Sequence, residues 1–145
     1  MTFNISQRPK ILDLSFSATL ENIDKAALET KRFLSSVRAE RHTFDVVLVL
    51  REALANAVVD GSQLDARKIV AYTLRLEGNN LIMEIEDEGE GFDWQNHFGK
   101  KTPPHAESGR GLAIMETYCE EVVFNDKGNK LILKKSLKLG DGDKP

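Results

Sequence analysis

Hydrophobic and polar positions change their spacing several times along the 145-residue chain, and each change predicts a different element of secondary structure. Residues 11–18 alternate apolar and polar side chains, which is the pattern of a half-buried strand. Across residues 20–37 the apolar positions recur at helical spacing, so an amphipathic helix is predicted there. A second helix is predicted from an N-cap at Thr43 to Gly61. Because that helix is apolar over most of its circumference, we expect it to pack deeply against a sheet.

Alternation returns in the second half of the chain. Two pairs of alternating segments, each joined by a turn that contains Gly and Asn, predict antiparallel hairpins: residues 69–76 with 81–86, and residues 122–125 with 131–136. Residues 92–108 have no usable periodicity and predict a loop, and a loop of that length in a compact domain is usually functional or mobile. A third helix is predicted over residues 112–119, and the tail at residues 140–145 is expected to be disordered.

Length, charge and cysteine content narrow the classes of function. The chain is expected to form a single domain over residues 1–145, with its core at residues 11–137. A formal net charge of -3 gives no general basic surface, so we expect no direct nucleic-acid partner and no membrane partner. The single cysteine, Cys119, cannot form an internal disulfide and is expected to be a small buried thiol. Without a signal peptide or an apolar run of about 18 residues, the protein is expected in the cytoplasm.

A narrow polar stripe runs along the second predicted helix. Glu52 and Asn56 lie four positions apart and therefore point the same way, one turn apart. Asp45 and Asp60 extend the stripe in both directions, and we expect it to stay uncovered where the rest of the helix packs. Taken alone, such a stripe is typical of the solvated face of an amphipathic helix. A functional site is the alternative.

Two glycine-containing segments add candidate chemistry. Residues 87–91 read D-x-G-x-G after a strand, so the backbone can turn sharply or a ligand can come close, and Asp87 would project from the strand end. An ordinary acidic turn would have the same pattern. Residues 108–112 form a Gly-x-Gly loop that opens into a helix, where unpaired N–H groups and the charge of Arg110 suit phosphate oxygens. A loop that simply begins a helix is the alternative.

Together and in this order, these segments resemble a known family. The strings REALANAVVDG, EDEGEGFD and SGRGLAIM are similar to the motifs of the Bergerat-fold (GHKL) ATP-binding family, and within it to the small anti-sigma-factor serine kinases of the partner-switching type. The resemblance covers residues 11–136. It implies an α+β fold, a two-layer sandwich in which a mixed, mostly antiparallel sheet carries helices on one face. Residues 92–108 would then be the ATP lid.

The resemblance also implies two cofactors, ATP and Mg²⁺, and roles for single residues. Asn56 matches the asparagine that coordinates Mg²⁺, a hard cation that accepts an amide oxygen together with phosphate oxygens and waters. Glu52 matches the proposed general base for a serine hydroxyl, and Asp87 matches the acceptor of a hydrogen bond from the adenine amino group. The other matches make room for the base or meet the phosphates: Gly89, Gly91, Gly109, Arg110, Gly111 and Leu112.

Partners follow from the same resemblance. Such proteins form homodimers, bind a sigma factor, and phosphorylate a serine of a STAS-type anti-anti-sigma protein, so these partners and this kinase activity are expected here. One residue departs from the pattern, because many relatives have histidine where this chain has Asp60. A carboxylate there would attract metal or repel phosphate, or it would simply cap the end of the exposed face. The alternative function is therefore a nucleotide-dependent binding module that sequesters a regulatory protein without phosphotransfer.

Overall fold

The computed structural model describes residues 2–89 and 107–137 of the chain. Its strands, in chain order, are β1 Phe3–Arg8, β2 Ile11–Ser17, β3 Ile69–Glu77, β4 Asn80–Glu86, β5 Glu121–Phe124 and β6 Lys130–Ser136. Its helices are α1 Leu20–Ser36, α2 Thr43–Ala55 and α3 Glu107–Tyr118. Two short helical turns flank α2, the 3₁₀ turn η1 at Glu40–His42 and the π-helical turn η2 at Asn56–Gly61.

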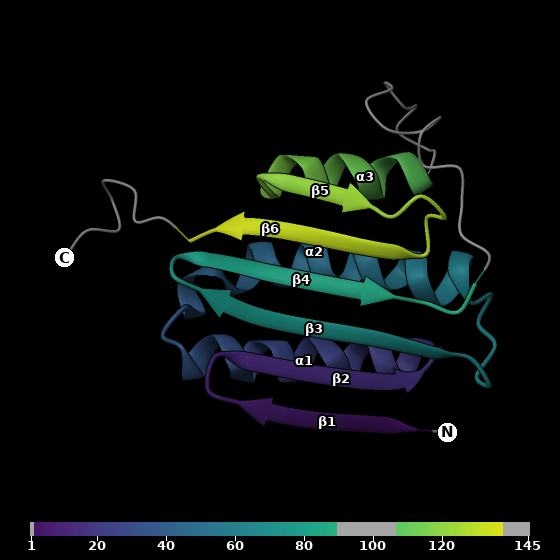
Figure 1. Cartoon of the computed structure of the whole chain (residues 1–145), viewed down its shortest axis with the longest axis horizontal. Coiled ribbons are helices and arrows are strands. Elements are labelled where there is room, and N and C mark those ends of the chain that lie inside the picture. Colours follow the sequence, from purple (N-terminus) through teal and green to yellow (C-terminus); the bar gives the residue numbers. More distant parts are fainter. Residues whose placement is uncertain (1, 90–106, 138–145) are drawn as a thin grey trace.

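The strands form one sheet in the order β1-β2-β3-β4-β6-β5, and the helices lie together on one of its faces (Figure 1). The prediction of a mixed, mostly antiparallel sheet is wrong in one detail, because every pairing between these described strands is antiparallel. The predicted α+β fold with two layers is confirmed. Pairing of β4 with β6 joins the two predicted hairpins within this sheet.

The core lies between the sheet and the helices. Alternate side chains of the four central strands are buried, as the period-two pattern predicts, and α2 is buried along its apolar face. A buried polar link joins the two layers: the Thr30 hydroxyl donates to the carbonyl of Ala26 at 2.8 Å and lies 2.7 Å from the Tyr72 hydroxyl. Both hydroxyls are therefore satisfied inside the core.

Strand β1 is an element that the sequence pattern does not predict. All of its residues beyond Phe3 are exposed, so no alternation of burial marks it in the sequence. It pairs with β2 in the register Phe3↔Phe16 to Arg8↔Ile11, and the Phe3 and Phe16 rings stack with centroids 5.6 Å apart. The folded region thus begins before the predicted core boundary at residue 11.

The second predicted helix covers the right residues but has a different start and a different final turn. Thr43 is the first residue of α2 and not its N-cap, and its hydroxyl donates to the carbonyl of Glu40 at 2.7 Å. From Asn56 the helix widens into η2, where the N–H of Ser62 donates to the carbonyl of Ala57, five residues back, at 2.8 Å. The predicted loop at 92–108 lies outside the described residues except for its last two, which begin α3, and the tail at 140–145 also lies outside them.

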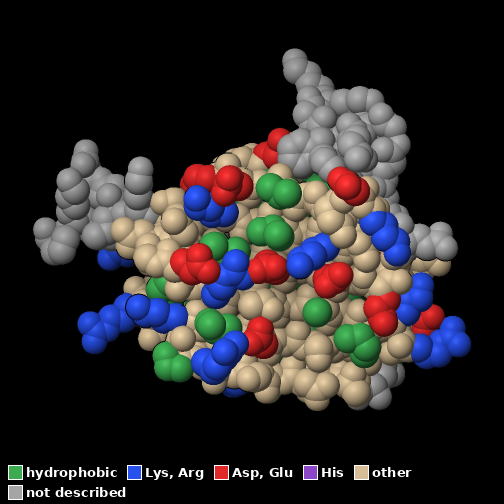
Figure 2. Space-filling view, viewed as in Figure 1, with side chains coloured by type: hydrophobic (Ala, Val, Ile, Leu, Met, Phe, Trp, Pro, Cys, Tyr) green, Lys and Arg blue, Asp and Glu red, His purple; other side chains and the backbone are tan. Residues whose placement is uncertain are grey.

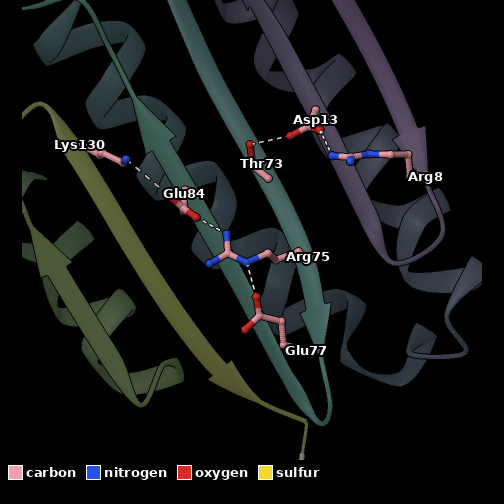
Figure 3. A network of polar contacts seen from close by, with 7 residues as sticks. All are labelled: Arg8, Asp13, Thr73, Arg75, Glu77, Glu84 and Lys130. Atoms are coloured by element: carbon pink, nitrogen blue, oxygen red, sulfur yellow. Dashed lines mark hydrogen bonds and ion pairs between the residues drawn. The ribbon is translucent and has the colours of Figure 1, made fainter.

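The sheet face that carries no helix has charged side chains of both signs interspersed with hydrophobic ones (Figure 2). Arg75 is the centre of one group, because its guanidinium donates to Glu77 at 2.6 Å and also to Glu84 (Figure 3). The hydrogen bond from Arg75 to Glu84 lowers the pKa of Glu84, and Lys130 lies 3.6 Å from the same carboxylate. Glu84 of β4 is therefore paired with charges on both neighbouring strands, Arg75 of β3 and Lys130 of β6.

A buried lysine ties the C-terminal end of α3 to the sheet and to α2. Lys135 of β6 is only 8% exposed, and its Nζ donates to the carbonyl of Tyr118 at 2.9 Å and lies 3.8 Å from Asp45 Oδ2. A buried ammonium group is costly unless it is paired, so these contacts hold that end of α3 in place. The adjacent thiol of Cys119 is buried, as expected, and burial raises its pKa to about 11.

Candidate functional site

A pocket of about 250 Å³ opens where the central strands β4 and β6 meet the end of α2, η2 and α3. Its walls are mainly apolar and carry a few polar groups, which is the composition of a small-molecule site. The helical side supplies Ala53, Asn56, Ala57, Asp60, Gly61 and Leu112, and the sheet side supplies Ile85, Asp87, Phe124, Gly128, Asn129, Lys130 and Leu131.

Asp87 gives the pocket a buried carboxylate. It is the first residue after β4 and is 8% exposed, and its Oδ1 accepts a hydrogen bond from the N–H of Gly89 at 2.7 Å. Burial raises the pKa of this carboxyl group above its ordinary value, although the hydrogen bond from Gly89 opposes the shift. A carboxylate with one fixed donor and further acceptor capacity can take a hydrogen bond from a ligand N–H.

Two glycines make room for this carboxylate. A Cβ on Gly61 would lie 2.5–2.7 Å from the carboxylate atoms of Asp87, and a Cβ on Gly89 would lie 2.0 Å from the carbonyl oxygen of Gly61. No side chain fits at either position, so the backbones at the end of η2 and after β4 are in direct contact. The D-x-G-x-G pattern predicts a sharp turn or the close approach of a ligand at Gly89, whereas the observed contact with Gly61 depends on how η2 lies against β4.

Glu52 and Asn56 face the same neighbour, as their spacing predicts. A Cβ on Gly111 of α3 would lie 3.3 Å from Glu52 Oε2 and 3.9 Å from both Asn56 Nδ2 and Oδ1. Asn56 also lines the pocket, whereas Glu52 lies one turn before it on α2. A carboxylate and an amide are thus presented together beneath the part of α3 that carries the second glycine of the Gly-x-Gly segment.

The rest of the polar stripe is not uniformly open. Asp60 is exposed and lines the pocket, but Glu52 and Asn56 are half-buried. Asp45 at the other end of α2 is half-buried too, because Lys135 lies beside it. The stripe therefore runs from a structural ion pair at one end to the pocket at the other.

The sequence of this chain is similar to a known domain family and to individual proteins. Residues 16–135 match the family described as the Histidine kinase-like ATPase domain. The chain belongs to this family. The anti-sigma F factor of Geobacillus thermodenitrificans is 30% identical over 134 residues, which cover 87% of this chain and 92% of that protein. The anti-sigma F factor of Clostridium perfringens is 26% identical over 132 residues, covering 86% of this chain and 94% of that protein.

Membership of the family confirms the resemblance that the sequence motifs indicate, to GHKL anti-sigma-factor kinases. An ATPase domain implies that the protein binds ATP. In the parts of the chain that the structure describes, no helix has the length and apolar character needed to cross a membrane. Within the same residues no three His, Cys, Asp or Glu side chains are grouped to hold a metal ion.

The structure brings some of the predicted residues of this ATPase domain together and leaves others undescribed. Asn56, Asp87 and Leu112 line one pocket, and Gly89 supports Asp87 from outside it. Gly91 lies outside the described residues, so its predicted role stays a prediction. The backbone of Gly109, Arg110 and Gly111 belongs to the first turns of α3, so the helix begins earlier than the sequence predicts.

Sequence reasoning missed Gly61 at the end of η2 and the residues that the β5–β6 hairpin brings to the pocket. Gly61 could have been noticed from its place directly after the Glu52–Asn56 helix, because a glycine at a helix end often marks a close approach. Asn129 and its neighbours have no such signal, since the pattern of residues 122–136 indicates only a hairpin.

Proposed function

We propose that this protein is an anti-sigma factor that binds Mg-ATP and phosphorylates a serine of a STAS-type anti-anti-sigma protein, controlling a sigma factor by partner switching. One observation supports this above the others. A single pocket has the buried carboxylate of Asp87 on one side and Asn56 on the other, and Asn56 shares its glycine neighbour with Glu52. The relatives that are anti-sigma F factors support the choice of partner.

The pocket fits the adenine end of ATP. Apolar side chains such as Ile85 and Leu131 would pack on the faces of the base, while the Asp87 carboxylate would accept a hydrogen bond from its 6-amino group. The absence of a Cβ at Gly61 and Gly89 leaves the carboxylate in that place. A purine with an amino group therefore satisfies a buried acceptor that would otherwise cost free energy.

Asn56 and Glu52 would serve the phosphate end. The Asn56 amide oxygen suits Mg²⁺, which takes few protein ligands and completes its shell with phosphate oxygens and waters. When bound, the cation neutralises phosphate charge.

The proposed reaction transfers the γ-phosphoryl group to a serine hydroxyl. The bond from the γ-phosphorus to the β-bridging oxygen breaks as the bond to the serine oxygen forms, giving phosphoserine and ADP. Glu52 would orient the hydroxyl and take its proton as general base. Its half-buried place one turn before Asn56 keeps this carboxylate close to the cation-binding amide without making it a pocket wall.

Asp60 favours the second candidate, a nucleotide-dependent binding module without phosphotransfer. Its exposed carboxylate lines the pocket one turn beyond Asn56 and adds negative charge where the phosphates of ATP would approach. Measuring ATP affinity and phosphoserine formation in Asp60→Asn distinguishes the kinase from the binding module. In a module the substitution raises ATP affinity and produces no phosphoserine.

Phosphotransfer from radiolabelled Mg-ATP to purified STAS proteins tests the proposal directly. We expect wild type to label one serine and Glu52→Gln to bind ATP normally while losing transfer by a factor of about 10² to 10⁴. Asn56→Ala should lose the Mg²⁺-dependent part of ATP binding in calorimetry. Glu116→Gln, the same chemical change on the exposed side of α3, is the matched control and should behave as wild type.

Each failure has a separate meaning. Equal transfer by wild type and Glu52→Gln would remove Glu52 from the base role. Nucleotide binding without transfer to any STAS protein would leave the binding module as the function. Absence of ATP binding by wild type would refute both candidates. Size-exclusion chromatography with light scattering tests the homodimer that the resemblance implies.

A further inference from the structure

The strand ladder between β4 and β6 continues one pair beyond its last regular residues. The register Glu86↔Lys130 places Asp87 opposite Asn129, and the N–H of Asp87 donates to the carbonyl of Asn129 at 2.9 Å. In a regular antiparallel pair the opposite N–H would return a second bond. Here the backbone N–H of Asn129 donates instead to Asn125 Oδ1 at 3.0 Å.

The Asn129 side chain supplies the missing second bond. Its Nδ2 donates to the carbonyl of Asp87 at 3.0 Å, so both main-chain polar atoms of Asp87 are held by one residue. The amide orientation is set from behind, because Asn129 Oδ1 accepts from Asn125 Nδ2 at 2.8 Å. With its oxygen engaged by Asn125, the amide of Asn129 directs its nitrogen at Asp87.

Asn125 is itself anchored in the β5–β6 turn. Its Oδ1 accepts from the N–H groups of Gly128, Asn129 and Lys130 at 2.7, 3.0 and 3.2 Å. Gly128 has a φ of +84°, which lets the backbone close this tight turn. The turn therefore forms a hydrogen-bonded unit that ends on the backbone of Asp87.

We propose that Asn129 is a positioning residue that sets the selectivity of the pocket for a 6-aminopurine, acting through the main chain of Asp87. This inference rests on the proposed binding of ATP. The N–H of Gly89 fixes the carboxylate of Asp87, and the side chain of Asn129 fixes its backbone. The carboxylate oxygens that would accept the hydrogen bond from the base are therefore held at a defined position in the pocket. Loss of the Asn129 amide frees the carbonyl of Asp87 and lets the carboxylate shift relative to the base.

Two nucleotides distinguish positioning from a general structural effect. One is ATP, and the other is purine riboside triphosphate, which lacks the 6-amino group and so makes no hydrogen bond to Asp87. Calorimetry on the full chain should show wild type preferring ATP by about tenfold or more, because a hydrogen bond to a charged group is lost with the analogue. Asn129→Ala should reduce that preference about fivefold, mostly by weakening ATP.

A second variant keeps the inference testable if Asn129→Ala does not fold. Asn125→Asp keeps an oxygen for the three N–H groups of the turn but removes the donor to Asn129, so it should lower the ATP preference in the same direction. Asn79→Ala is the matched control, because Asn79 is an exposed asparagine in the other hairpin turn, at the opposite end of β4. It should leave the preference unchanged.

The outcomes separate this inference from the proposed function. A wild type that binds no ATP refutes the proposed function and the inference with it. A wild type that prefers ATP, with Asn129→Ala and Asn125→Asp keeping the full preference, overturns the inference alone. An equal loss of affinity for both nucleotides also overturns it, because a merely structural role would weaken both. Circular dichroism confirms that each variant is folded.

Discussion

Replacing Gly61 by alanine tests whether the end of η2 must lie against the Asp87 carboxylate. The added Cβ would lie 2.5 Å from Oδ2, 2.6 Å from Cγ and 2.7 Å from Oδ1 of Asp87. Non-bonded heavy atoms have their optimal separation at about 3.5 Å, so the carboxylate of Asp87 or the end of η2 must move by about 1 Å. The bond from Gly89 to Asp87, now 2.7 Å, would lengthen beyond hydrogen-bond range after such a shift.

The size of the effect follows from these contacts. Inserting a methyl group into a packed site costs about 1–3 kcal/mol of unfolding free energy. Misplacing the acceptor for the adenine amino group removes a hydrogen bond to a charged group, which corresponds to about 1.5–3 kcal/mol, or a loss of ATP affinity of about tenfold to hundredfold. Calorimetric titration with ATP measures the affinity, and denaturant unfolding measures the stability.

Gly78→Ala is the matched control. Gly78 has a φ of +61°, and no atom lies within 4 Å of the place that a Cβ would take, so alanine there introduces backbone strain of about 1 kcal/mol without touching the pocket. It should lower stability and leave ATP affinity unchanged. Wild-type ATP affinity in Gly61→Ala would refute the claim that this contact sets the carboxylate position, even if the variant were less stable.

Two further predictions concern buried polar groups. Burial raises the pKa of Asp87 above its ordinary value of 3.8, so the ionised form costs the folded state free energy above the raised pKa. Asp87→Asn should therefore be more stable than wild type at pH 7, with the gain shrinking as the pH falls through that pKa, and should bind ATP more weakly. Wild-type ATP affinity should also fall over that acidic range, and a flat affinity profile from about pH 7 to about pH 4 would contradict this. Ser62→Ala should unfold at an equal or higher denaturant concentration, because among the described residues the buried Ser62 hydroxyl has no hydrogen-bond partner, and a loss above about 1 kcal/mol would contradict it.

The parts of the fold that sequence predicts are those decided by local burial. Strands β2, β3, β4 and β6 each have one face in the core, so their residues alternate and their positions follow from the pattern. Strand β1 is an exposed edge whose place depends on pairing with β2, and no local pattern encodes that pairing. The start of α2 differs from the prediction for a related reason, because η1 continues directly into it and occupies the position of a cap.

The candidate site divides in the same way. Glu52 and Asn56 are related by one helical turn, and the structure places both against Gly111, so simple periodicity is sufficient to pair them. Gly61 and Asn129 reach Asp87 only through tertiary contacts, one by the widening of η2 and the other by the β4–β6 register.

Helix α3 is held by different contacts at its C-terminal end and at Gly111, in its first half. At its C-terminal end the buried ammonium group of Lys135 donates a hydrogen bond to the carbonyl of Tyr118. At Gly111 the backbone of the helix lies directly against the side chains of Glu52 and Asn56, because glycine has no side chain. With a rise of about 1.5 Å per residue, Gly111 lies about 10 Å from Tyr118 along the helix axis. If α3 tilted by about 10° about Tyr118, Gly111 would move by about 2 Å. Such a tilt would change the distance between Gly111 and Glu52, and it would also displace Leu112 and Met115, which are buried in the core.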